Sequence, residues 1–164
     1  MRKRSITSVW NDTGGSVLIE ATLVTPFLFT LMFGLFEFSW YFHKQQLVES
    51  GIRDAARYLA RVNAGNEDGN PCSDATSVAQ AQNIAVTGVT SGGTPRVPGW
   101  SVGNVTISCP SFDNTGLSYA GATTIYRVTA TTSFTDPALG FFTLLGLSTP
   151  NLSASHSERS IGPG

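Results

Sequence analysis

The sequence predicts an α+β protein. A long N-terminal helix spans a membrane or packs among copies of itself, and a small domain follows with a second helix and an antiparallel sheet of about three strands. Three observations support this fold class. A nearly uncharged apolar run lies close to the N-terminus, an apolar stripe with helical spacing follows it, and from Val102 onward apolar and polar residues alternate. Helices segregated to one face of an antiparallel sheet are the usual α+β arrangement.

The apolar run is long enough to cross a bilayer. From Ala21 to Phe42 only Glu37 is charged, and a helix of that length reaches roughly 33 Å against a hydrocarbon layer of ~30 Å. The apolar region of a signal peptide is shorter, usually ~7–15 residues, and ends in a small-x-small cleavage site that is absent here. We therefore predict a transmembrane or assembly helix over residues 16–42, in which Pro26 removes one backbone hydrogen bond and should produce a kink.

Two carboxylates in the predicted helix over residues 16–42, those of Glu20 and Glu37, need an explanation. A carboxylate near hydrocarbon costs about 2.5–3.5 kcal/mol, so it normally has a partner. Cleavage after Gly15 would expose an amino terminus at Ser16, and its charge could pair with Glu20 in the same chain or in a neighbouring subunit. The alternatives stay open. Glu20 could lie at the level of the lipid headgroups, beside the basic residues near the N-terminus, and Glu37 could contact headgroups instead of another subunit.

The helix is predicted to continue beyond the membrane and to end at residues 64–66, Ala-Gly-Asn. Its apolar residues recur at three- and four-residue steps and form one stripe, namely Leu47, Gly51, Ala55, Tyr58, Leu59 and Val62. A second face carries the charged residues Glu49, Arg53, Arg57 and Arg61. This face is either solvated or pairs with acidic surfaces of neighbouring subunits or with lipid phosphates.

The rest of the chain predicts one more helix and the strands. Asp74 should cap a helix over Ala75–Val86, with Gly88 as its stop. Alternation of apolar and polar residues then predicts strands around residues 102–109 and 126–134 and a third near residues 152–154. The apolar segment from Asp136 to Leu147 is too short to span a bilayer. It is either a buried loop that closes the core or an exposed apolar patch.

The two cysteines, Cys72 and Cys109, lack the spacing of metal ligands. In an oxidising compartment a bridge between them would contribute about 4 kcal/mol of stability; two buried free thiols are the alternative. The net charge of −1 and the scattered basic residues do not favour nucleic-acid binding. No motif indicates a metal or another cofactor.

One catalytic pattern occurs, because residues 99–103, Gly-Trp-Ser-Val-Gly, fit G-x-S-x-G. Asp113 or Asp136 and then His156 follow in the order that α/β-hydrolases use. The context argues against a nucleophile elbow, which needs a strand before Ser101 and a helix after it. Here a proline-containing loop precedes the serine and a strand pattern follows, so we predict no enzyme.

The N-terminal third resembles the TadE-like family, the minor pilins or pseudopilins of bacterial tight-adherence (Tad) pilus systems. The resemblance is carried by Gly15 and Glu20, by Pro26, by G-L-F-E-F at residues 34–38 and by A-A-R at residues 55–57. It is weaker at the C-terminal end, in L-L-G-L at residues 144–147 and L-S-A-S at residues 152–155. The middle of the chain, about residues 65–121, carries none.

The resemblance implies a function and a location. Residues 1–15 would be a leader cut by a prepilin peptidase after Gly15, with Glu20 needed for processing or assembly. Residues 16–42 would lie in the bacterial inner membrane with the N-terminus cytoplasmic, and residues 43–164 would form a periplasmic α+β domain. The implied partners are other pilin and pseudopilin subunits, the prepilin peptidase, the inner-membrane assembly platform and the lipid bilayer.

Two other hypotheses stay open at this point. The chain could be an unprocessed, single-pass membrane anchor for a periplasmic binding domain, or a membrane-anchored serine hydrolase that uses Ser101. An N-terminus at Met1 in cells that contain the peptidase would favour the first of these, and an esterase activity lost in Ser101→Ala would favour the second.

Overall fold

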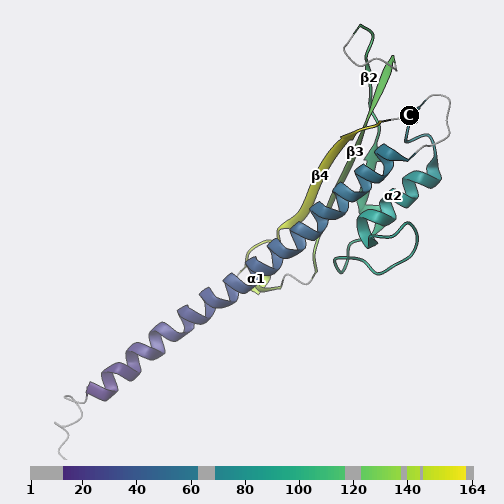
Figure 1. The fold of residues 1–164 in the computed structure, drawn as a ribbon. Coiled ribbons are helices and arrows are strands. Elements are labelled where there is room, and N and C mark those ends of the chain that lie inside the picture. The colour runs from purple at the N-terminus through teal and green to yellow at the C-terminus, as the bar shows by residue number, and fades with distance from the viewer. Residues whose placement is uncertain (1–12, 63–68, 117–122, 138–139, 145, 162–164) are drawn as a thin grey trace, which may run out of the picture. The chain divides into compact units, whose positions relative to one another are not determined.

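The computed structural model describes residues 13–62, 69–116, 123–137, 140–144 and 146–161 (Figure 1). The chain divides into two compact units, residues 1–39 and 40–164. Helix α1, Thr13–Arg61, belongs to both. The first twelve residues of the predicted leader and the predicted helix end at residues 64–66 lie outside the described residues.

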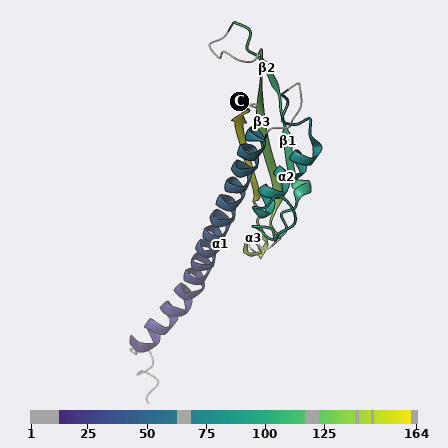
Figure 2. The same cartoon turned by 45° about the vertical axis from the view of Figure 1, so that its right-hand side comes forward.

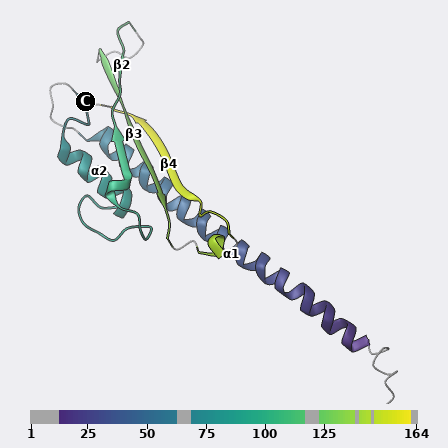
Figure 3. The same cartoon turned by 180° about the vertical axis from the view of Figure 1, so that it is seen from behind.

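The second unit contains the remaining elements. In chain order these are α2 (Ala75–Thr87), the short 3-10 helix η2 (Val102–Asn104), β1 (Val105–Ser108), β2 (Ser111–Asp113), β3 (Thr124–Thr135), α3 (Phe141–Leu144) and β4 (Asn151–Arg159). The long strand β3 pairs antiparallel with β1 and β2 along one edge and with β4 along the other, as Figure 3 shows for β3 and β4. The predicted α+β class is confirmed, with four strands where about three were expected.

Strands β1 and β2 share one register. Ser108 pairs with Thr129 and Ser111 pairs with Tyr126, so the two pairs are three residues apart both on β3 and on the segment that contains β1 and β2. The two short strands therefore continue the same line of pairing along β3. Between them lies Pro110, whose carbonyl accepts a hydrogen bond of 3.0 Å from the N–H of Arg127. Proline has no N–H to return, so one ladder hydrogen bond is missing and the strand is interrupted there.

Helix α2 is bounded by the residues that the sequence indicated. The Asp74 carboxylate accepts hydrogen bonds of 3.0 Å from the N–H groups of Thr76 and Ser77 and one of 2.6 Å from the Ser77 hydroxyl. These hydrogen bonds hold the pKa of Asp74 below its ordinary value. The bond from the Ser77 hydroxyl has the largest effect, and those from the two N–H groups come next. At the other end Gly88 has φ 83°, a left-handed conformation that favours glycine. The helix ends one residue later than predicted.

The core lies on one face of the sheet. The even-numbered residues of β3 from Val128 to Phe134 are buried, whereas the intervening residues are exposed or half-buried, which is the alternation of a strand with one covered face. Both helices supply residues to this core. Trp100 is buried among them, stacks on Phe134 at 5.9 Å between ring centroids, and donates its indole N–H to Thr132 Oγ1.

The buried stripe of α1 is wider than the predicted one. Gly51, Ala55 and Leu59 are buried as expected, while Leu47, Tyr58 and Val62 are only half-buried. The other buried apolar residues of the stripe are Val48, Ile52, Ala56 and Ala60. The stripe widens because α1 contacts both the sheet and α2, and each contact needs its own row of apolar side chains.

Helices α1 and α2 approach closely at Gly51. A Cβ at this position would lie 2.2 Å from the carbonyl oxygen of Ala85 in α2 and 2.8 Å from Cη2 of Trp100. Both distances are shorter than van der Waals contact, so only glycine fits here without a backbone shift.

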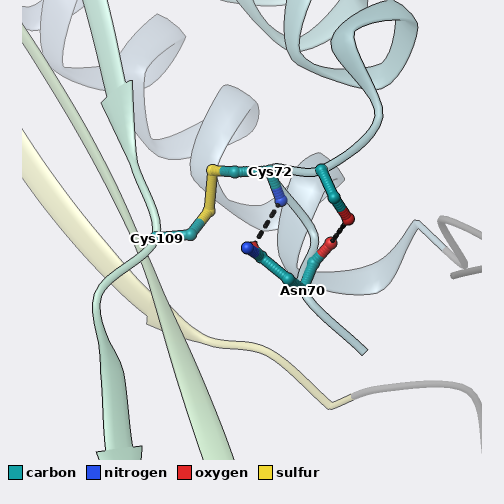
Figure 4. Close-up of a disulfide and its surroundings, with 4 residues drawn as sticks. Asn70, Cys72 and Cys109 are labelled. Carbon is teal, nitrogen blue, oxygen red and sulfur yellow. Dashed lines mark hydrogen bonds between the residues drawn. A yellow bond between two sulfur atoms is a disulfide. The ribbon is translucent and has the colours of Figure 1, made fainter. Parts of the chain in front are cut away.

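Cys72 and Cys109 form a disulfide (Figure 4). It joins the segment before α2 to the residue after β1, with the two Cα atoms 5.9 Å apart. Asn70 shapes the turn that presents Cys72. Its side-chain oxygen accepts from the N–H of Cys72 at 3.0 Å, and its carbonyl accepts from the Ser73 hydroxyl at 2.6 Å.

Side chains of the helices occupy carbonyl groups on both outer edges of the sheet. In β4 the carbonyl of Asn151 accepts from the Tyr41 hydroxyl at 3.3 Å, and that of Ser153 accepts from the Gln45 amide at 2.6 Å. In β1 the carbonyl of Val105 accepts from the Gln82 amide at 2.9 Å.

Candidate functional site

The first unit consists of the apolar part of α1. Its large side chains are exposed from Val17 to Phe38. Among the described residues one helix is long and apolar enough to cross a membrane, and none of its most apolar window is buried. A helix that is apolar on all sides and uncovered by its own chain is suited to lipid or to packing against similar helices. These features fit a single-pass membrane protein.

The predicted processing residues lie at the start of α1. Gly15 and Ser16 are in its first turn, and a Cβ at Gly15 would have no heavy atom within 4 Å. Glu20 follows one turn later and is exposed. Within the described residues its carboxylate has no hydrogen-bond or ion-pair partner. In the described chain, therefore, no cation lies beside this carboxylate.

The hydroxyl groups of the apolar segment are satisfied within the helix. Those of Thr22, Thr30 and Ser39 each donate to the carbonyl four residues earlier, at 2.7, 2.9 and 2.9 Å. The Thr30 hydroxyl donates to the carbonyl of Pro26, and α1 is continuous across this proline. Local bonds of this kind let hydroxyl groups reside in hydrocarbon. Glu37, the other carboxylate of the segment, is half-buried.

The second unit begins at Trp40, and the first turn of α1 within it, residues 40–44, contributes to an ion pair that the sequence did not predict. The Lys44 ammonium contacts Asp136, which follows β3, and their side chains are only 4% and 0% exposed. Lys44 Nζ also lies 5.2 Å from the centre of the Trp40 ring. The two partners are ninety-two positions apart in sequence, and no local pattern links them. From the sequence, Asp136 is a possible triad member and the first residue of the apolar segment, and neither role predicts a contact with Lys44.

The charged face of α1 is exposed, and one of its residues reaches the sheet. Arg57 Nε donates to Glu158 Oε1 on β4 at 3.2 Å, and His156 Nε2 lies 3.0 Å from the same oxygen. The hydrogen bond to His156 and then that from Arg57 lower the pKa of Glu158. Glu49, Arg53 and Arg61 are exposed.

The serine of the G-x-S-x-G pattern and its possible triad partners each contact a different group. Ser101 precedes η2, and its hydroxyl donates to Asn104 Oδ1 at 2.7 Å. Asp136 is buried against Lys44, His156 lies beside Glu158, and Asp113 holds the turn at Thr115. Each has a different partner. The serine is followed by the three-residue helix η2 and then by strand β1, not by the long helix that a nucleophile elbow needs. Within the part of the chain that the structure describes, no group of three or more His, Cys, Asp and Glu side chains is placed to hold a metal ion.

Comparison with known proteins identifies the N-terminal helix. Neither a curated protein nor a solved structure matches the chain. One family model, described as TadE-like protein, matches residues 15–57. The match begins at the predicted cleavage residue Gly15 and ends four residues before α1 does. The family match confirms, over residues 15–57, the resemblance to the TadE-like family that the sequence indicated.

Proposed function

We propose that the protein is a minor pilin, or pseudopilin, that takes part in the assembly of a Tad-type adhesive pilus after a prepilin peptidase removes residues 1–15. The TadE-like match supports an association with this pilus system. The observation that carries the finer proposal is the carboxylate of Glu20, which has no partner among the described residues and lies one turn after Gly15 on an exposed apolar helix.

Assembly gives this carboxylate a partner. Cleavage after Gly15 creates a positive amino terminus at Ser16, and the same reaction in a neighbouring subunit creates another. When apolar helices leave lipid and pack together, a buried Glu20 has to meet a cation, because an unpaired charge away from water is costly. The proposed partners are therefore other pilin subunits, the peptidase and the inner-membrane assembly platform, with the second unit in the periplasm. The protein is the peptidase's substrate and has no catalytic role.

Processing is tested by the N-terminal residue of protein recovered from cell envelopes, read by intact mass. We expect Ser16 in wild-type cells and Met1 both in a strain without the peptidase and in Gly15→Leu. The open space around Gly15 means that the larger side chain disturbs recognition and not packing. Val17→Leu is the matched control and should be processed normally. Met1 in wild-type cells that contain the peptidase would refute the proposal.

The role of Glu20 is tested separately. Glu20→Gln keeps the size of the side chain and removes its charge, so processed protein should accumulate in the membrane and be lost from sheared pili. Glu49→Gln removes an exposed carboxylate from the same helix and should leave the sheared fraction unchanged. Equal amounts of Glu20→Gln and wild-type protein in sheared pili would show that this charge has no part in assembly.

A second function has one observation in its favour. Gly15 and Ser16 lie within the first turn of α1, and a helical peptide bond must unwind before a protease can cut it. If the helix stays intact, the chain is an unprocessed single-pass anchor for a binding domain. The consecutive glycines at residues 14 and 15 make this turn inexpensive to unwind, and the same N-terminal measurement separates the two functions.

A further inference from the structure

The segment between β3 and β4 exposes large apolar side chains. Leu144 is 79% exposed and Leu147 is 55% exposed. From Pro137 to Pro150 the sequence has no Asp, Glu, Lys or Arg. The expected alternatives for this segment were a buried loop and an exposed patch, and these two leucines correspond to the patch. Exposed apolar residues grouped in this way mark a contact surface.

Both ends of the segment are fastened to the same short stretch of α1. Asp136, just before it, is held by Lys44, and Asn151, just after it, accepts a hydrogen bond from Tyr41. The segment therefore lies beside the first turn of α1 in the second unit, and Figures 2 and 3 show α3 next to α1 there. On that turn Trp40 and Phe42 are also exposed, by 54% and 56%.

This end of the domain is where the proposed membrane span stops. Trp40 and Tyr41 follow the apolar unit directly in sequence, and tryptophan and tyrosine concentrate at the level of lipid headgroups. Because the segment is fastened to α1 just after the proposed span, insertion of α1 would bring its leucines close to the lipid headgroups.

We propose that Leu144 and Leu147, together with Trp40 and Phe42, insert into the bilayer interface, so that a loop as well as a helix holds the domain against the membrane. The inference rests on the proposed single-pass insertion of α1. Lipid is the occupant that the chemistry favours. The segment has no charge with which to select a protein partner, and every inserted copy meets lipid at this height.

Depth measurements on the full chain test the proposal. The two native cysteines are joined in the disulfide, so one added cysteine can be spin-labelled alone, and unlabelled wild type provides the check. The variants are Leu144→Cys, Leu147→Cys, Phe33→Cys within the span, and Val89→Cys, an exposed apolar position just beyond α2. Each protein is placed in vesicles of phosphatidylethanolamine and phosphatidylglycerol. Collision rates with oxygen, which concentrates in lipid, and with a water-soluble nickel chelate then report the depth of each label.

We expect the ratio of oxygen to nickel collisions to be highest at position 33, intermediate at 144 and 147, and several-fold lower at 89. A span label in lipid with labels at 144 and 147 as water-exposed as the one at 89 would overturn the inference and leave the proposed insertion intact. A water-exposed label at position 33 would instead refute the insertion itself. Labels at 144 that are shielded from both reagents and broadened by spin–spin coupling would identify a second copy as the occupant, against the proposal. Circular dichroism of each variant verifies that the domain is folded.

Discussion

The close approach of α1 and α2 at Gly51 makes a sharp prediction about stability. In Gly51→Ala the new methyl group would lie 2.2 Å from the backbone carbonyl of Ala85, where ordinary contact begins at about 3.4 Å. The carbonyl belongs to a helix and cannot rotate away, and Trp100 blocks the other side at 2.8 Å. The two helices therefore have to separate.

Two effects of opposite sign set the magnitude. Alanine is the better helix former by roughly 1 kcal/mol, which alone would stabilise the variant. Forcing extra volume into a close-packed site typically costs about 1–3 kcal/mol, and the upper end applies here because backbone has to move. The net loss should be about 2 kcal/mol. With a urea dependence of about 2 kcal/mol per M, the unfolding midpoint should fall by about 1 M.

The assay is urea unfolding of the full chain in detergent micelles, followed by near-ultraviolet circular dichroism, which reports the packing of aromatic side chains in the second unit. Gly103→Ala is the matched control. Its added Cβ would have only the Ser101 hydroxyl within 4 Å, at 3.8 Å, so its midpoint should stay close to that of wild type. A Gly51→Ala midpoint at or above the wild-type value would refute the packing described for these helices.

Three further predictions concern the second unit. Lys44→Met or Asp136→Leu alone should destabilise the domain by about 3–5 kcal/mol, because each leaves a buried charge without the opposite charge that it contacts in the wild type, whereas the double variant should recover most of that loss; additive single effects in the unfolding free energies would contradict this. Asp74→Ala should lower stability at neutral pH. Because the folded pKa of Asp74 lies below its ordinary value of 3.8, its contribution is present above pH 3.8 and is lost as the pH falls through the folded pKa, so wild-type and variant midpoints should converge in acid. Replacing Cys72 and Cys109 by serine should cost about 4 kcal/mol in unfolding experiments, and free thiols in protein isolated from cells under thiol-trapping conditions would show that the bridge does not form there.

The features with local signals were predictable from the sequence. Asp74 and Gly88 mark the ends of α2 because an N-cap carboxylate and a left-handed glycine act within a few residues of their own position. The core positions of β3 follow from alternation with one covered face. The proline-containing loop expected before Ser101 was likewise visible in the glycine and proline content of residues 91–99.

The features that depend on distant contacts were not predictable. Strand β2 is exposed on both faces, so it has no alternation to detect. The burial of Lys44 depends on Asp136, which only the folded chain brings to it. The full width of the buried stripe on α1 could be predicted only by knowing that two elements cover the helix. Whether residues 136–147 are buried or exposed could be decided only from the positions of Leu144 and Leu147 in the structure.

The side chains on the outer edges of the sheet have a consequence for crowding. An open strand edge is a template on which another chain can add a strand, and identical copies in a membrane would meet at high local concentration. Tyr41 and Gln45 occupy acceptors at the start of β4, and Gln82 occupies one on β1. Strand addition at these points would first have to displace the protein's own helices. The helices' own side chains therefore disfavour edge-to-edge aggregation of crowded copies at these points of the sheet.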